Sequence, residues 1–101
     1  MTVPAQTIFQ SKYNNTVSST PLSLVDFGFT IAELGRASSA HIVVETAAIR
    51  YGFGIHAINA GVGKLKSSAD EFIVEGAQNL MNMMMVADSG TDALVHVDIA
   101  N

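Results

Sequence analysis

The chain has no cysteine and no tryptophan, and it contains few charged residues. Without cysteine there is no disulfide framework, no thiolate nucleophile and no cysteine-ligated metal. Only 14% of the 101 residues are charged, whereas an average soluble domain has about 25%. Because 49% of the residues are hydrophobic, few charges remain to cover the outside. We therefore expect other chains to bury part of the surface.

Positive charge is scarcer than negative charge. Five Lys and Arg residues stand against nine Asp and Glu residues, which gives a net charge of −4. Nucleic-acid phosphates are neutralised by Lys and Arg, so we do not expect a nucleic-acid partner. The first residues lack the basic and apolar regions of a secretory signal, and the longest strongly apolar stretch, Leu80 to Ala87, is too short to cross a bilayer. We expect synthesis in the cytoplasm and no membrane partner.

No motif predicts catalysis. The three histidines, His41, His56 and His96, lack the spacing of a helical metal site. Gly61-Val62-Gly63-Lys64 lacks the earlier glycine and the following hydroxyl residue of a phosphate-binding loop. His96 and Asp98 alternate onto one face of a strand, within reach of a hydrogen bond, but no nucleophile accompanies them. We predict no enzyme, no cofactor and no metal site.

Short β-branched stretches separated by turn residues predict an all-β chain. We expect strands over residues 22–27 (continuing to 31 after a bulge), 41–45, 49–53, 64–66, 72–75, 80–87 and 93–99, a loop over 12–20, and turns over 35–39 and 67–70. The last strand places Val95, Val97 and Ile99 inward, and the turn residues of 88–92 predict a hairpin connection before it. The pattern predicts one antiparallel β-sandwich over residues 1–101, jelly-roll-like.

The segment 69–87 allows two alternatives. Ser68-Ala69-Asp70-Glu71 has the pattern of a capping box, and Met, Leu and Ala favour a helix over the whole segment. Gly76 in its middle, beside the β-branched Ile73 and Val74, favours two strands joined by a turn over 76–79. The sequence favours the strands without excluding the helix.

A methionine cluster marks the second of these strands. Strand alternation places Met81, Met83 and Met85 on one face and further apolar side chains on the other. A strand that is apolar on both faces needs two covers. We expect either a neighbouring subunit, for which methionine is an adaptable contact residue, or a crowded core.

The N-terminal segment also offers contact residues. Residues 1–11 are uncharged except for the N-terminus, and Ile8 and Phe9 are their strongest apolar anchors. An extended arm of this kind adds a strand to another molecule, and a plain first strand of the sandwich fits the same pattern. Ile8 and Phe9 therefore join Met81, Met83 and Met85 as candidate interface residues.

The second half of the chain resembles small bacteriophage structural proteins. The residues that carry the resemblance are Ile49-Arg50-Tyr51, the loop that ends in Gly61-Val62-Gly63, the segment 71–76 and the ending 87–97. The resemblance is to β-sandwich capsid decoration (cement) proteins and related virion accessory proteins. It implies a homo-oligomer, often a trimer, that binds the major capsid protein on the outer capsid surface, stabilises the shell and carries no active-site residues.

Three further functions stay open at this stage. A neck or tail adaptor of the same particle would differ only in its location. A ligand- or carbohydrate-binding β-sandwich would need exposed aromatic side chains. An enzyme with a site between subunits would need an acid pair or a histidine near a nucleophile. A bound metal, or a pocket lined by His56 and carboxylates at a subunit boundary, would favour it.

Overall fold

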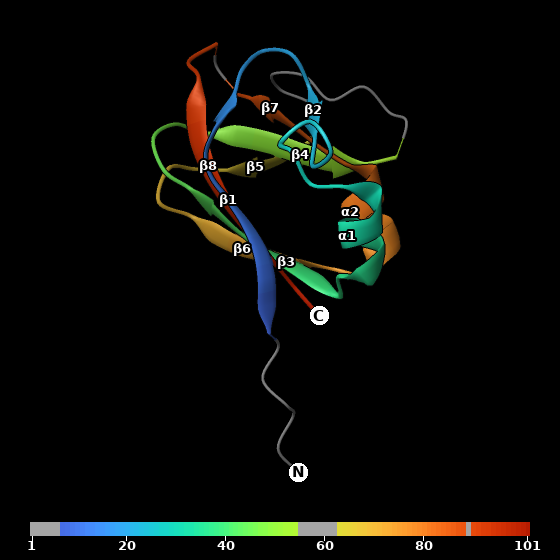
Figure 1. Cartoon of the computed structure of the whole chain (residues 1–101). Coiled ribbons are helices and arrows are strands. Elements are labelled where there is room, and N and C mark those ends of the chain that lie inside the picture. Colours follow the sequence, from blue (N-terminus) through green and yellow to red (C-terminus); the bar gives the residue numbers. More distant parts are fainter. Residues whose placement is uncertain (1–6, 55–62, 89) are drawn as a thin grey trace.

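Two four-stranded sheets pack against each other in the computed structural model, which describes residues 7–54, 63–88 and 90–101 (Figure 1). Sheet A has the strand order β1–β8–β3–β6, and sheet B has the order β2–β7–β4–β5. All paired strands are antiparallel, which confirms the all-β sandwich. The strands are β1 (Ile8–Val17), β2 (Leu22–Ser23), β3 (Ser39–Val44), β4 (Ile49–Phe53), β5 (Lys64–Lys66), β6 (Glu71–Glu75), β7 (Met83–Ala87) and β8 (Ala93–Ala100).

One apolar core fills the space between the sheets. Val95, Val97 and Ile99 of β8 are fully buried, as the alternation predicted, because every second side chain of a strand points to the same face. At the side where β5 and β6 approach each other, the rings of Tyr51 and Phe72 stack with their centroids 4.6 Å apart. This pair joins the inner faces of the two sheets at their edge.

Two short helices, α1 (Ile31–Arg36) and α2 (Ala77–Asn82), lie side by side at one end of the sandwich (Figure 1). The sequence favoured neither helix. It predicted strand and turn over 28–39, and over 69–87 it favoured two strands joined by a turn over 76–79, with one long helix as the alternative. The Met81 side chain of α2 packs over Gly35 of α1, with its Cε 3.3 Å from the position that a Cβ on Gly35 would take. No described helix is long and apolar enough to span a membrane.

A capping box starts α1. The Glu33 N–H donates to Thr30 Oγ1 at 3.0 Å, and the Thr30 N–H donates to Glu33 Oε1 at 2.8 Å. The Gln10 side chain of β1 donates to Glu33 Oε2 at 2.8 Å. The Thr30 N–H, and after it the Gln10 amide, lower the pKa of the Glu33 carboxyl because both hydrogen bonds favour the ionised form.

The segment 69–87 forms neither one continuous helix nor two strands joined by a turn over 76–79. α2 ends at Asn82 and β7 begins at Met83, so Met81 does not share a strand face with Met83 and Met85. Met83 and Met85 are on the inner face of β7 and have no exposed surface. The core interpretation therefore applies to both of these side chains, and they have no surface left for a partner.

Three further predictions, of a loop, a strand and a hairpin connection, were wrong. Residues 12–17 belong to β1, whose register shifts between Lys12 and Asn15, where Asn14 has a φ of 59°. Only Leu22–Ser23 of the strand predicted over 22–27 is extended, because a turn follows in which the Ser23 N–H donates to Asp26 Oδ2. The connection over 88–92 is not a hairpin, since β7 lies in sheet B and β8 lies in sheet A.

The predicted capping box at residues 68–71 is part of a turn. The Ser67 N–H donates to Asp70 Oδ2 at 2.8 Å, Ala69 has a φ of 71°, and Glu71 already belongs to β6. Short polar side chains such as that of Asp70 satisfy backbone donors in turns as well as at helix ends, which is why the pattern did not distinguish the two.

Candidate functional site

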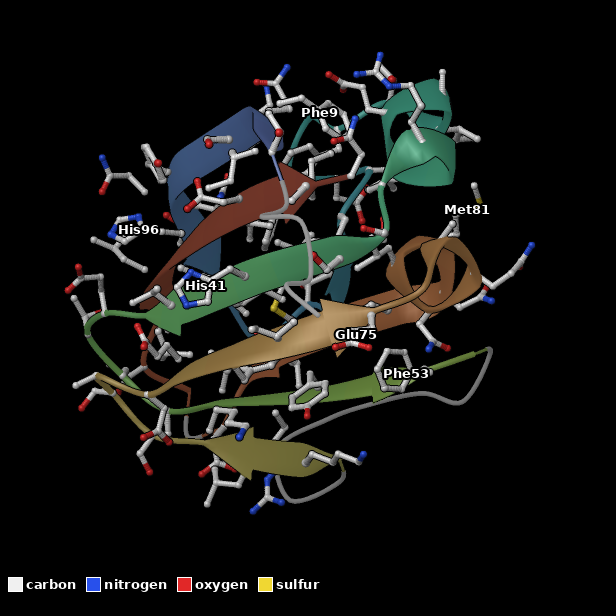
Figure 2. The ribbon with its side chains drawn as sticks, turned by 90° about the horizontal axis from the view of Figure 1, so that it is seen from below. Phe9, His41, Phe53, Glu75, Met81 and His96 are labelled. Carbon is white, nitrogen blue, oxygen red and sulfur yellow. The ribbon has the colours of Figure 1, made fainter. Side chains whose placement is uncertain are left out.

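The outer face of sheet A is where polar, titratable and exposed apolar side chains gather (Figure 2). The pairing of four strands arranges these side chains in rows across the sheet. The first row runs from Ile8 of β1 through Ala100 of β8 and Ser39 of β3 to Glu75 of β6. These four residues are far apart in the sequence, so only the sheet brings them together.

The second row contains one polar pair and one member of another. It runs from Ser11 through Asp98 and His41 to Ile73. The Ser11 hydroxyl donates to Asp98 Oδ1 at 2.5 Å. His41 Nε2 lies 3.5 Å from Glu71 Oε2, at the edge of the sheet.

A shallow hollow of about 240 Å³ lies over these two rows. Its floor is formed by Ala100 and Ser39, which are small and buried, so the middle of the first row rises less above the sheet than its neighbours. Larger side chains stand around this floor: Ile8, His41, Ile73 and Asp98. The hollow therefore follows from two small residues at paired positions of β8 and β3.

His96 lies in the next row and is held by three contacts. The Asn14 N–H donates to His96 Nδ1 at 2.9 Å, Nε2 lies 3.1 Å from Glu45 Oε1, and the Tyr13 ring meets the imidazole edge-on at 5.5 Å. Because Nδ1 accepts a hydrogen bond, Nε2 carries the proton and donates to Glu45. The hydrogen bond that the sequence allowed between His96 and Asp98 does not form, since the two ring nitrogens contact Asn14 and Glu45 and Asp98 accepts from Ser11.

This face is acidic. Glu45, Glu71, Glu75 and Asp98 all lie on it, and within the described ranges none of the four carboxylates forms an ion pair with Lys or Arg. Glu71, Glu75 and Asp98 are scattered along the sequence, and strand pairing places them on one surface. The chain's five cationic side chains are held elsewhere: Lys12 beside Gly28, Arg36 over Phe9, Arg50 on Asp88, Lys64 over Tyr51 and Lys66 over Phe72.

Large apolar side chains are exposed on the same face. Ile8 is 55% exposed, Tyr13 is 60% exposed and Ile73 is 62% exposed. A single exposed apolar residue is ordinary, but several on one sheet face are typical of a surface that contacts another molecule. Ile8 and Ile73 stand on the two edge strands, one on each side of the hollow.

The candidate interface residues from the sequence are not brought together. Ile8 reaches the outer face of sheet A, where it pairs with β8 of the same chain as part of β1. Phe9 packs against the core and lies under the guanidinium of Arg36 at 4.3 Å. Met83 and Met85 are in the core, and Met81 lies in α2.

Most of the residues that line the hollow were not predicted from the sequence. His41 was considered only as a metal ligand, and within the described ranges no three His, Asp or Glu side chains lie close enough to hold a metal ion. His56 is outside the described residues. One available signal was the alternation of Glu71, Ile73 and Glu75, which marks the outer face of β6.

Comparison with known proteins adds no relative. No protein-family model matches the chain. No curated protein and no solved structure matches it either.

Proposed function

We propose that this protein is a structural assembly module that docks onto a protein shell through the outer face of sheet A, as a capsid decoration protein does. The observation that carries the proposal is the character of that face. It combines exposed Ile8, Tyr13 and Ile73 with a hollow and with carboxylates that form no ion pair with Lys or Arg in the described part of the chain. No described part of the chain covers it (Figure 2). The proposed virion location follows from this role.

The strand order supports a virion protein. β1 pairs with β8, β2 with β7, β3 with β6 and β4 with β5. One long antiparallel hairpin of four strand pairs, rolled into two sheets, gives this order, and we therefore propose a jelly roll. Viral capsid domains and lectins use this architecture. Since one fold serves many functions, the surface carries more of the argument than the topology.

Self-association into a trimer remains part of the proposal, although the buried Met83 and Met85 no longer support it. Light scattering after size exclusion, at several protein concentrations, measures the mass directly. A closed oligomer of constant mass is expected. A monomer at every concentration would contradict the oligomer and leave the shell contact to be tested by itself.

Binding to the shell is tested by co-sedimentation. Empty shells assembled from the capsid protein of the same source are mixed with the purified chain, and the bound fraction is measured together with the temperature at which the shells come apart. We expect saturable binding and a higher shell-disassembly temperature. Ile73→Asp on the outer face of sheet A should abolish the binding, whereas the matched variant Leu65→Asp on β5 should retain it, because Leu65 is exposed away from this face. Equal loss of shell binding in Ile73→Asp and Leu65→Asp, or no shell binding by the wild type, would refute the proposal.

Tyr13 favours one alternative function. It is an exposed aromatic ring on the outer face, steadied by its edge contact with His96, and carbohydrate-binding sites use such rings. If this alternative holds, oligosaccharides shift the resonances of Tyr13 and Tyr13→Ala removes the effect. A neck or tail adaptor instead predicts that the chain sediments with tail components and leaves the shell unbound.

A further inference from the structure

We propose that the hollow on the outer face of sheet A receives a lysine or arginine side chain that a partner protein presents. This inference rests on the proposed docking function and names the chemistry of the contact. The hollow is defined by the floor residues Ala100 and Ser39 and by the wall residues Ile8, His41, Ile73 and Asp98.

The shape of the hollow suits a long side chain with an aliphatic stem. Its floor spans two neighbouring strands, which lie about 4.8 Å apart in a sheet. Ile8 and Ile73 stand on opposite sides of this floor and offer apolar surface to methylene groups. Lysine and arginine bury such stems along apolar surface while their charged ends reach polar groups.

The charges around the hollow select a cation. Asp98 is a wall residue whose Oδ1 accepts one hydrogen bond from Ser11, and a carboxylate has room for about four. Glu75 lies at the end of the row that contains the floor, and Glu71 lies beside His41. A cation in the hollow would meet Asp98 directly, and Glu71 and Glu75 lie outside the lining and add negative charge to the surrounding face. Within the described residues, no Lys or Arg of the same chain forms an ion pair with these carboxylates.

The cationic side chains of this protein are poorly placed to fill the hollow of a second copy. Arg50 is engaged by Asp88 at 2.6 Å and by the Gly63 carbonyl at 3.0 Å. Arg36 lies on the Phe9 ring, and the end of the Lys12 side chain lies beside Gly28. Lys64 and Lys66 lie on rings at the seam between β5 and β6. We therefore assign the occupant to a different protein, so that the contact joins unlike subunits.

The test uses the full chain and two small probes. N-butylguanidinium carries the charge and stem of arginine, and N-butylurea has nearly the same shape without the charge. In a titration followed by ¹H–¹⁵N NMR, N-butylguanidinium should shift the amides of Ile8, His41, Ile73 and Ala100 in a saturable manner. N-butylurea should shift them far less, because only the charged probe gains from Asp98.

Two matched variants locate the effect. Asp98→Asn keeps an oxygen for the Ser11 hydroxyl but removes the charge, and it should weaken binding of N-butylguanidinium about fivefold, the worth of one exposed ion pair. Asp92→Asn makes the same change of net charge at an exposed position outside the hollow, and binding should stay as in the wild type. Thermal melts of both variants show that each still folds.

Each other outcome overturns the inference. Shifts that do not saturate, equal shifts from both probes, or equal weakening in the two variants would remove the cation site. An oligomer that dissociates in Asp98→Asn would replace the unlike partner by a second copy. If Asp98→Asn still binds the shell but does not bind N-butylguanidinium, this inference alone is refuted. If the wild-type protein does not bind the shell, the proposed function is refuted.

Discussion

Replacing Met85 by alanine tests whether the methionines of β7 are core residues or contact residues. Met85 has no exposed surface, and it lies opposite Leu22 of β2 and Tyr51 of β4. Truncation of the side chain leaves a cavity between the two sheets, and the surrounding residues relax only partly to fill it. We therefore expect Met85→Ala to lower the free energy of unfolding by about 3 kcal/mol, within the roughly 2–5 kcal/mol range of buried Met→Ala changes.

The neighbouring Met84 is the matched control. It precedes Met85 on the same strand, points to the opposite face and is half-buried. Met84→Ala removes the same atoms with less loss of buried surface, and we expect a cost of about 1 kcal/mol. In a chain of 101 residues, the difference of about 2 kcal/mol corresponds to roughly 10 °C in Tm.

Urea unfolding at two protein concentrations measures both variants. A core role predicts that Met85→Ala lowers the midpoint by the same amount at each concentration and leaves the mass of the protein unchanged. A loss below about 1 kcal/mol, well under the range for buried Met→Ala changes, would refute the core assignment. If Met85→Ala loses stability only at low protein concentration and its particles have a smaller mass than those of the wild type, the interface interpretation would be restored.

Three further predictions concern local contacts. Because hydrogen bonds lower the folded-state pKa of Glu33 below 4.5, its ionised form stabilises the protein above about pH 4.5, and this contribution disappears as the pH falls through the lower folded value. Glu33→Gln should therefore lower the Tm at pH 7 but not at the acid end of a pH series. A difference in Tm between Glu33→Gln and the wild type that stays constant with pH would contradict this. Asn14 has a φ of 59°, so Asn14→Gly should keep the urea midpoint while Asn14→Ala should cost about 1 kcal/mol; equal midpoints would show that the left-handed conformation carries no strain. Arg50 and Asp88 meet at 2.6 Å and are partly buried, so a double-mutant cycle should give a coupling of about 1 kcal/mol, and a coupling near zero would exclude a stabilising pair.

The parts of the fold that follow from local pattern were predicted well. The bounds of β4 and β5 match the structure, and the alternation of β8 places Val95, Val97 and Ile99 in the core. These strands carry β-branched or alternating side chains between clear turn residues, so local propensity and burial agree.

The two helices show what the pattern could not supply. α1 and α2 have six residues each, which is too short to display a helical period. α1 had a usable signal in Thr30 and Glu33, whose spacing is that of a capping box. α2 begins after Gly76 without a side-chain cap, and its Leu80 is held in the core by tertiary packing.

The candidate site could not be predicted because it depends on strand pairing. Ile8, Ser39, Ile73 and Asp98 come from four strands, and no single segment contains two of them. Alternation indicates which side chains leave the core, but it does not indicate which strands are neighbours. The hollow also depends on Ala100 and Ser39 being small at paired positions, which has no signature in one sequence.

The most direct test of the docking surface is hydroxyl-radical footprinting of the free chain and of the chain bound in its assembled particle. Labelling reports the exposure of individual side chains. Docking through the outer face of sheet A predicts that labelling of Ile8, Tyr13 and Ile73 falls strongly on assembly, while labelling of Ile31 and Leu65 stays as in the free chain. Unchanged labelling of Ile8, Tyr13 and Ile73, with protection of Ile31 or Leu65 instead, would contradict the account.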